Sequence, residues 1–397
     1  MTARAVVTVN AGSSSLKFCR YHLEAGGTLS VAARGAVEGI GGSPRLAVQG
    51  GDGRTLVERQ FSRSELRDPG DAVREVATWL GSHFDDRAAA VGHRFVHGGA
   101  EFATPVALDA ATLDKLKALI PLAPLHQPFN VGAVEAVSRY LPGVPQVACF
   151  DTAFHSGHAE VARLIPLPWD LYQSGVSRYG FHGLSYEYIS SVLPRVAPEI
   201  AAGRVIVAHL GSGASLCAMR NGRSVDSTFG FTALDGLCMG TRPGAVDPGA
   251  VLYLFQQLGR SATDVEAILY KQSGLLGISG ISNDMRELLA SAEPRARLAV
   301  DYFVYRAAKE IGALTASIGG LDALVFTAGI GERSAEIRRR ICEASAWLGL
   351  TLDSDANERG GPRVSAPGSK VSAWVVPTDE ELMIARHTCR VLGLTAS

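Results

Sequence analysis

Three glycine-rich turns each follow an apolar, strand-like run, and they are the segments of the sequence best suited to bind a ligand. They occupy residues 10–15, 209–215 and 327–332. Because glycine has no Cβ, backbone N–H groups in such turns can closely approach the oxygen atoms of a phosphate. The GxxxxGK[ST] loop is absent, and Leu216 stands where a dinucleotide motif would have its third glycine. The turns therefore favour nucleotide binding outside these two classes.

Four polar side chains lie among apolar residues, where a catalytic group could sit. They are Arg94 in a strand-like segment, Asp151 after a strand, His182 between glycines and Arg242 in a glycine-proline loop. Active-site groups often lie in loops at strand ends. Any one of them alone would fit a structural role better, so only the set indicates catalysis.

Two histidine pairs have spacings that occur in metal sites. His93 and His97 are four residues apart without the glutamate of an HExxH motif, and His155 and His158 form an HxxH. A zinc site needs further ligands, which are not evident near either pair. We therefore expect no zinc at either pair.

The strands and helices around these residues must hold them in place. Residues 5–9 predict a strand into the first turn, and residues 16–21 predict its returning partner. The other expected elements are a hairpin around residues 51–53, a helix near 70–86, a strand at 88–96, strands at 205–208, 216–219 and 323–326, a tight turn at 221–222 and a helix within 334–348. A helix that begins after Gly331 would direct its positive end at a phosphate.

The first two glycine turns resemble each other. Each has an apolar strand, a polar residue and then Gly-Ser, at Gly12 and Gly211, although one residue must be slipped to align the following serines. The two turns are about half a chain apart, as a duplicated domain requires.

The composition is that of a folded protein with a large core. Of 397 residues, 47% are hydrophobic and 19% are charged, and the formal net charge is -1. These values argue against disorder and against a nucleic-acid-binding surface. No apolar run suits a membrane span or a signal-peptide core. Six cysteines without a CxxC pair indicate free buried thiols in a reducing cytoplasm.

Short motifs spread along almost the whole chain resemble the acetate and propionate kinase family. They are VNAGSSSLK (9–17), GHR (92–94), PLH (124–126), FDTAFH (150–155), RYGFHG (178–183), HLGSG (209–213), MGTR (239–242), SGLLGISG (273–280), FTAGIGE (326–332) and PTDEEL (377–382). Each motif alone is weak, but all of them in this order are highly specific.

The resemblance implies an α/β fold of two duplicated ribonuclease-H-like domains, as in actin, sugar kinases and heat-shock ATPases, with the nucleotide in the cleft between them. It places the N-terminal domain at 1–150, joined by a C-terminal helix at 383–397, and the nucleotide-binding domain at 151–382. It further implies a cytoplasmic homodimer that acts in acetate metabolism, on the route between acetate and acetyl-CoA.

The resemblance also assigns the site residues. Catalysis falls to Arg94, Asp151, His182 and Arg242, and the acid contacts Arg94, Val96, Leu125, His126 and Phe181. ATP contacts Ser13, Ser15, Lys17, His209, Leu210, Gly211, Ser212, Gly213, Asp284, Met285, Arg286, Gly329, Ile330, Gly331, Glu332 and Arg333. Asn10 and Glu380 lie near Mg²⁺ or Mn²⁺.

Several positions depart from the family pattern. Ser212 and Arg333 each replace a usual Asn in the nucleotide segments, Gln127 replaces Asn, and Ala245 replaces Asp. Ala233 stands where a pocket proline is common, so the pocket for the acid could accept more than acetate.

The expected reaction is reversible transfer of the ATP γ-phosphoryl group to the carboxylate of acetate, which gives acetyl phosphate and ADP. A carboxylic acid has a pKa of about 4, so the substrate is ionised and needs no general base. We expect direct in-line attack, with Arg94 on the carboxylate and Arg242 and His182 on the transferred group. We interpret Asp151 as orienting Arg94, the metal or its water, whereas the family pattern labels it an acid/base.

Three alternatives remain. A propionate or butyrate kinase would use the same chemistry; Ala233 permits it, whereas Val96 and Phe181 disfavour a long acid. A non-catalytic ATPase switch of the same superfold would not need the two arginines and the histidine together. A sugar kinase would need a base for its hydroxyl nucleophile, and the paired arginines favour an anionic substrate instead.

Overall fold

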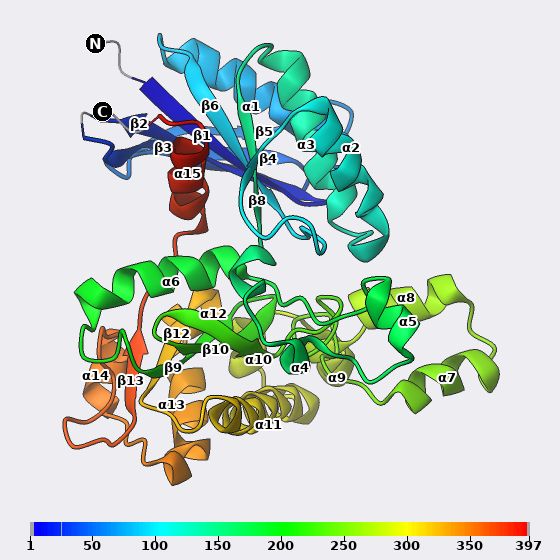
Figure 1. Cartoon of the computed structure of the whole chain (residues 1–397), viewed down its shortest axis with the longest axis vertical. Coiled ribbons are helices and arrows are strands. Elements are labelled where there is room, and N and C mark those ends of the chain that lie inside the picture. Colours follow the sequence, from blue (N-terminus) through cyan, green and yellow to red (C-terminus); the bar gives the residue numbers. More distant parts are fainter. Residues whose placement is uncertain (1–3, 25, 395–397) are drawn as a thin grey trace. The chain divides into compact units, whose positions relative to one another are not determined.

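The computed structural model describes residues 4–24 and 26–394 (Figure 1). The chain forms two compact units, one of Met1–Ala153 with Asp379–Ser397 and one of Phe154–Thr378, which we call unit 1 and unit 2. The domain boundaries expected from the sequence, 150/151 and 382/383, lie three and four residues from these.

Unit 1 is built on an eight-stranded mixed sheet in the order β5-β4-β3-β2-β1-β6-β8-β7. The strands are β1 (Arg4–Ala11), β2 (Ser15–Leu23), β3 (Leu29–Glu38), β4 (Arg45–Gly50), β5 (Thr55–Gln60), β6 (Ala88–Phe95), β7 (Val106–Ala107) and β8 (Gln146–Phe150). β1 to β5 pair antiparallel, whereas β6 is parallel to β1 and β8 is parallel to β6. The expected hairpins at 5–21 and around 51–53 are confirmed.

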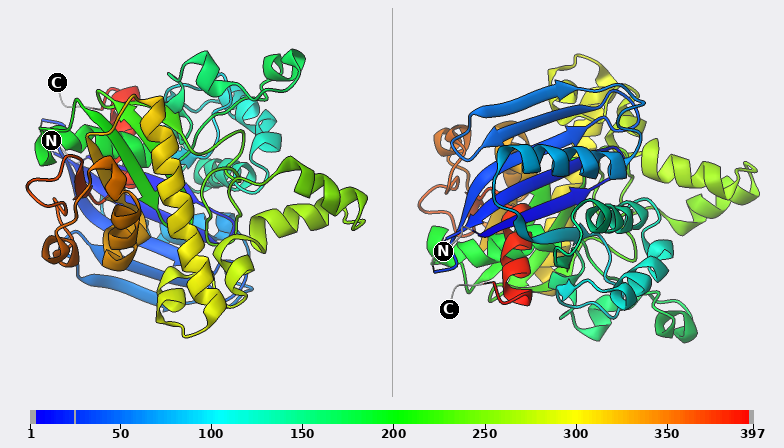
Figure 2. Two further views of the ribbon diagram at one scale, coloured as in Figure 1. Left: turned by 90° about the horizontal axis from the view of Figure 1, so that it is seen from below. Right: turned by 90° about the horizontal axis from the view of Figure 1, so that it is seen from above.

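Helices cover both faces of this sheet. They are α1 (Pro69–His83), α2 (Ala110–Ala118), α3 (Gln127–Tyr140) and α15 (Glu380–Val391), with a 3-10 turn at Ile120–Leu122. Val7 packs with residues of α1 and α3, whereas Val6 packs with α15, because adjacent strand residues face opposite ways. Figure 2 (right) shows α1 lying across the strands. Gly92 of β6 has no Cβ, and this lets Ile384 and Thr388 of α15 approach the strand.

Unit 2 has a five-stranded sheet in the order β11-β10-β9-β12-β13. The strands are β9 (Arg204–Leu210), β10 (Ala214–Arg220), β11 (Arg223–Ser227), β12 (Ala323–Thr327) and β13 (Ser372–Val375). The turn at Asn221 and Gly222 has positive φ at both residues, 53° and 69°, as a tight two-residue hairpin requires.

The helices of unit 2 lie on the sheet faces and beyond them. They are α4 (Glu160–Arg163), α5 (Trp169–Gln173), α6 (Gly183–Val196), α7 (Pro248–Gln256), α8 (Ala262–Lys271), α9 (Gly274–Ser279), α10 (Met285–Ala290), α11 (Pro294–Ser317), α12 (Ala328–Arg333), α13 (Ala335–Ala344) and α14 (Ser354–Arg359), with 3-10 turns at Ala153–His155 and Ala346–Leu348. α6 shares a buried apolar cluster with β9, β10, β12 and β13. The long helix α11 packs against β9, β10 and β11 (Figure 2, left).

The two units share one strand plan, which agrees with the duplication that the sequence predicts. The order β3-β2-β1-β6-β8 in unit 1 matches β11-β10-β9-β12-β13 in unit 2. In each unit, the three strands that come first in sequence pair antiparallel with one another. The next of the five strands runs parallel to the first, and the last runs parallel to that one. The α/β fold of two ribonuclease-H-like units is therefore confirmed.

One local expectation is wrong. Residues 327–332 do not form an open glycine turn followed by a helix after Gly331, because α12 already begins at Ala328. Ser334 then accepts a hydrogen bond from Ile337 N–H and caps α13, so the second helix starts afresh. The glycines allow close packing in α12: Gly331 is buried against Ala208 and Phe326.

Two further expectations from the composition of the sequence concern its cysteines and possible membrane spans. All six cysteines are free and buried, as predicted. Within residues 4–24 and 26–394, no helix has both the length and the apolar character to cross a bilayer.

Candidate active site

The arginine expected to bind the acid lies at one edge of the unit 1 sheet, paired with a carboxylate. Arg94 is the penultimate residue of β6, and Asp151 directly follows β8. These strands are parallel neighbours, so both side chains lie where the C-terminal ends of the strands meet. Arg94 Nε donates to Asp151 Oδ1 at 3.0 Å, and Nη2 donates to Oδ2 at 2.6 Å. The structure thus joins two predicted catalytic residues in one bidentate ion pair.

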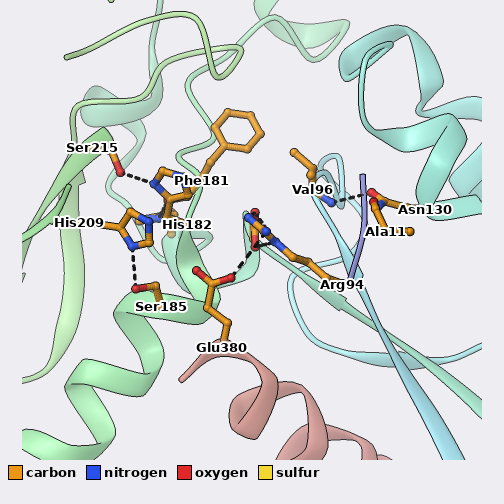
Figure 3. Close-up of polar contacts among 12 residues, drawn as sticks. Ala11, Arg94, Val96, Asn130, Phe181, His182, Ser185, His209, Ser215 and Glu380 are labelled. Atoms are coloured by element: carbon orange, nitrogen blue, oxygen red, sulfur yellow. Dashed lines mark hydrogen bonds and ion pairs between the residues drawn. The ribbon is translucent and has the colours of Figure 1, made fainter. Parts of the chain in front are cut away.

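Glu380 is a second carboxylate at the same guanidinium (Figure 3). Its Oε2 lies 3.6 Å from Arg94 Nη1. Glu380 is the first residue of α15, and Asp379 caps that helix by accepting a hydrogen bond from Leu382 N–H. A predicted metal-associated residue from the C-terminal part of the chain therefore contacts the predicted acid-binding arginine.

Burial and pairing set the charges of the Arg94 cluster. The Asp151 side chain is only 2% exposed. Burial acts to lower the pKa of Arg94, but the carboxylates of Asp151 and Glu380 raise it above its ordinary value. Burial raises the pKa of Asp151, and the Arg94 guanidinium opposes that change. Because both oxygens of Asp151 accept hydrogen bonds from a guanidinium that has only donors, we assign Asp151 as a carboxylate.

Asn130 is a site residue that the sequence reasoning missed (Figure 3). Its Oδ1 accepts from Val96 N–H at 3.2 Å, and its Nδ2 donates to Ala11 C=O at 2.9 Å. Asn130 therefore fixes the predicted pocket residue Val96 against the end of β1. The 127–130 segment is notable in the sequence for its departure at Gln127, and Asn130 is the last residue of that segment. Gln127 itself is buried and donates to His97 C=O.

The first glycine turn connects β1 and β2. Gly12 N–H donates to Ser15 C=O at 2.8 Å, which closes the hairpin and leaves Ser13 exposed. Asn10 and Lys17 are directly opposite in the antiparallel pair, so both side chains project from the same face. The predicted metal-associated residue and the predicted phosphate contact are thus neighbours across the hairpin.

The donor groups in unit 1 fit magnesium. Asn10 and Glu380 carry amide and carboxylate oxygens, the hard donors that Mg²⁺ prefers, and Mg²⁺ usually takes only one or two such protein groups beside phosphates and waters. Throughout the described parts of the chain, no three or more His, Cys, Asp or Glu side chains gather as a metal cluster. By donor type, Asn10 and Glu380 are therefore compatible with Mg²⁺.

The second glycine turn, between β9 and β10, is where two further predicted catalytic side chains meet. Gly211 N–H donates to Gly213 C=O at 3.0 Å. A Cβ at Gly213 would lie 2.8 Å from Arg242 Nη2 and 3.2 Å from His182 Nε2. Arg242 and His182 therefore converge on Gly213, and only glycine leaves room for both.

His182 is held in one orientation by neighbours in unit 2 (Figure 3). It has a left-handed backbone, with φ of 58°, and directly precedes α6. Its Nδ1 lies 2.8 Å from Ser215 Oγ, which is 2.6 Å from the Tyr186 hydroxyl. Its ring stacks on His209 with 4.0 Å between centroids, and His209 Nδ1 lies 2.8 Å from Ser185 Oγ. These contacts use Nδ1 of His182, while Nε2 is the atom that lies toward Gly213.

Arg242 is buried but remains a cation. Its Nη1 donates to Ala233 C=O at 2.6 Å. Burial lowers its pKa to about 10, which still leaves it protonated at neutral pH. Ala233, where the family pattern has proline, thus supports Arg242 through its backbone. A proline would keep that carbonyl, so the departure at Ala233 does not by itself remove the support.

The other predicted nucleotide segments lie elsewhere in unit 2. Asp284 caps α10 and pairs with Arg286 at 2.6 Å, and Met285 is buried. In α12, the Glu332 carboxylate accepts from Ala328 N–H at 2.8 Å and from Thr378 N–H at 3.1 Å. Glu332 therefore ties α12 to the end of unit 2, a structural role that the sequence did not indicate.

The predicted pocket residues come from both units. Leu125 and His126 are half-buried just before α3 in unit 1. Phe181 is buried in unit 2, edge-on to Phe229 with 5.6 Å between ring centroids. The structure thus groups the predicted site residues within each unit: Arg94, Asp151 and Glu380 in one, and His182, Arg242 and Gly213 in the other.

Comparisons with known proteins agree on one family. The sequence profile of the Acetokinase family matches residues 5–386. The chain is 52% identical over 387 residues to the acetate kinase of Nitrobacter hamburgensis, which covers 98% of this chain and 96% of that protein. It is 53% identical over 391 residues to the acetate kinase of Rhodopseudomonas palustris strain CGA009, covering 97% and 98%.

Solved structures give the same picture. The crystal structure of Porphyromonas gingivalis acetate kinase is similar with a TM-score of 0.86 and 38% identity, covering 98% of this chain and 100% of that one. A propionate kinase from Francisella tularensis is similar with a TM-score of 0.90 and 35% identity, with the same coverage.

Proposed function

Because this chain belongs to the acetokinase family, we propose that it is an ATP-dependent acetate kinase, which reversibly forms acetyl phosphate and ADP from acetate and ATP. The observation that carries the proposal is the pair of cationic centres. Arg94 is braced by carboxylates in unit 1, and Arg242 with His182 converges on a glycine hairpin in unit 2. An anionic nucleophile that attacks an anionic phosphoryl group needs positive charge on both reactants.

We propose that Arg94 binds the acetate carboxylate. Asp151 fixes the Nε edge of the guanidinium, so the plane of Arg94 is set before the substrate arrives. The attacking carboxylate is already ionised, since an acid of this kind has a pKa of about 4. Asp151 therefore orients Arg94 and does not need to accept a proton.

Arg242 and His182 stabilise the transferred phosphoryl group in this mechanism. With Nδ1 of His182 accepting from the Ser215 hydroxyl, Nε2 carries the proton and can donate to a phosphoryl oxygen. Arg242 supplies a fixed positive charge beside it. Both groups are positioned in advance, so little reorganisation is needed during transfer.

The nucleotide and its metal complete the proposed site. We assign the ATP phosphates to the two glycine hairpins, with Lys17, and the rest of the nucleotide to the predicted segments of unit 2. Asn10 and Glu380 would hold Mg²⁺, which in such reactions neutralises phosphate charge.

The test is a hydroxamate assay with Mg-ATP and subsaturating acetate, propionate or butyrate. We expect the highest rate constant with acetate. Preference for a longer acid would keep the mechanism and make the protein a propionate or butyrate kinase, which Ala233 permits and which the similar Francisella tularensis structure makes the nearest alternative. ATP hydrolysis without acyl phosphate from any acid would refute the kinase assignment and favour an ATPase switch.

We propose further that the protein is a cytoplasmic homodimer. Helix α7 buries none of its residues within the chain and exposes large apolar side chains. These are Leu252, Tyr253 and Phe255, with Leu258 just beyond. A second copy would cover such a face. Light scattering after gel filtration should give twice the chain mass, and Leu252→Glu should give a monomer; a wild-type monomer would refute this part of the proposal.

A further inference from the structure

His155 and His158, the HxxH pair, belong to a buried hydrogen-bond network in unit 2. His155 Nδ1 lies 2.8 Å from Ser224 Oγ, and His158 Nε2 lies 2.6 Å from the same oxygen. Cys217 Sγ is 3.3 Å from it. The other nitrogen of His155, Nε2, lies 3.0 Å from the carbonyl oxygen of Phe181. His155 is 1% exposed, so water does not replace these contacts.

The proton positions in this network follow from counting donors. The Phe181 carbonyl can only accept, so His155 Nε2 must carry a proton. Burial lowers the pKa of His155 to about 3, so the ring is neutral and Nδ1 is an acceptor. Ser224 has one hydroxyl proton and must donate it to Nδ1. Its oxygen then accepts from His158 and from the Cys217 thiol, and the chain of donors points in one direction, toward Phe181.

The end of this chain lies next to the proposed catalytic histidine. Phe181 immediately precedes His182, whose left-handed backbone is unusual for a residue with a side chain. The His155 ring also packs on the backbone of Gly180: a Cβ there would lie 2.6 Å from His155 Cγ. Gly180 itself has φ of 77°. His155 thus contacts the turn at the two residues before His182.

We propose that His155 is a positioning residue for phosphoryl transfer, which fixes the Gly180–His182 turn by donating from Nε2 to the Phe181 carbonyl. This inference rests on the proposed function of His182. The HxxH pair then supplies a directional hydrogen-bond chain, and its second histidine, His158, orients Ser224. Loss of the His155 bond lets the turn relax, so that His182 Nε2 no longer lies correctly for the transition state.

The kinetic test uses three single variants. His155→Phe keeps a flat ring but removes both hydrogen bonds, and we expect kcat to fall about 10- to 100-fold, equal to roughly 1.4–2.7 kcal/mol. His155→Gln retains an N–H that can reach the carbonyl and should recover most of kcat. His158→Phe is the matched control: it loses the bond to Ser224 but leaves the His155 bond to the Phe181 carbonyl in place, and kcat should fall less than threefold. The Michaelis constants for ATP and acetate should change little.

A double-mutant cycle separates positioning from general damage. In a His182→Ala background, His155→Phe should cause almost no further loss of kcat, because its effect passes through His182. An equal loss in both backgrounds, or an effect on Michaelis constants alone, would overturn the proposal. If wild-type protein makes no acyl phosphate, the proposed function fails instead, so the two failures are distinguishable.

A spectroscopic test on the wild-type protein needs neither activity nor a folded variant. Long-range ¹H–¹⁵N spectra should show His155 as the Nε2–H tautomer, unchanged between about pH 5.5 and 8. The charged groups that act on the pair are Asp226, Arg178 and Arg163. Two further titratable groups lie beside it: Cys217 contacts Ser224, and the Tyr186 ring packs edge-on against His155. An Nδ1–H tautomer, or titration of His155 in this range, would contradict the donor chain.

Discussion

Replacing Asp151 with asparagine tests whether this residue orients Arg94 or transfers a proton. The amide keeps one oxygen, which can still accept from Arg94 Nε at the Oδ1 position. Its NH₂ group replaces Oδ2, the partner of Nη2 at 2.6 Å, and puts a donor against a donor. One hydrogen bond to a charged group is worth about 1.5–3 kcal/mol. We therefore expect kcat/KM for acetate to fall roughly 10- to 200-fold.

The pH dependence of the loss in kcat/KM distinguishes an orienting role of Asp151 from a proton-transfer role. The pKa of Arg94 is raised by Asp151 and Glu380, against the effect of burial, so Arg94 stays charged from pH 6 to 9. Acetate is also ionised throughout this range, because its pKa is about 4–5. Neither partner titrates, so an orienting role predicts the same fold loss at every pH. Acid-saturation curves by the hydroxamate assay at several pH values measure this ratio.

A base role predicts a different profile. If Asp151 removed or delivered a proton, Asp151→Asn would be nearly inactive at low pH and recover at high pH, and this result would refute the orienting role. Asp86→Asn is the matched control, since Asp86 pairs with buried Arg20 at the opposite end of β6. It should lower the midpoint of thermal unfolding and leave kcat/KM for acetate almost unchanged.

Three further predictions concern unit 2. Arg242→Ala should lower kcat by roughly 10²–10³-fold with a much smaller change in KM for the acid; a change in KM alone would contradict the stabiliser role. Ser215→Ala removes the partner of His182 Nδ1 and should lower kcat roughly 2- to 13-fold, because one hydrogen bond is worth about 0.5–1.5 kcal/mol. Ser185→Ala removes the partner of His209 and should act mainly on KM for ATP. The same kinetic change in both variants would argue against separate roles for His182 and His209. Arg338 is buried, and its guanidinium donates to the carbonyls of Gly331 and Glu332 and to Asn357. Arg338→Lys cannot reach all of these acceptors and should lower the free energy of unfolding by about 3 kcal/mol in urea titrations; unchanged stability would show that α12 does not depend on this bracing.

The sequence by itself determined the local structure and the family. Short apolar runs predicted the strands, and glycines predicted the hairpins at Gly12 and Gly211, because these preferences act within a few residues. The similar turns half a chain apart predicted a duplicated domain, and the two sheets share one strand order. The ordered motifs led to the family, because many short matches in sequence order are specific even when each is weak.

Local rules were less reliable where the chain packs on itself. The glycines of 327–332 predict a turn, but the segment folds as α12. Glu332 accepts from the N–H of Ala328 and of Thr378, and Arg338 binds two carbonyls of the helix. These partners lie outside the segment, so its own sequence could not indicate that it would be helical.

Only the tertiary structure decided which side chains share a partner. Arg94 pairs with Asp151, 57 residues away, because β6 and β8 are parallel neighbours, and α15 brings Glu380 to the same guanidinium. Likewise, Asn130 reaches Ala11 across 119 residues, and His155 meets Ser224 across 69. A sequence pattern gives the type and spacing of such residues, but hydrogen bonds depend on distances of a few tenths of an ångström. Those distances are set by sheet pairing and helix packing, which no local pattern encodes.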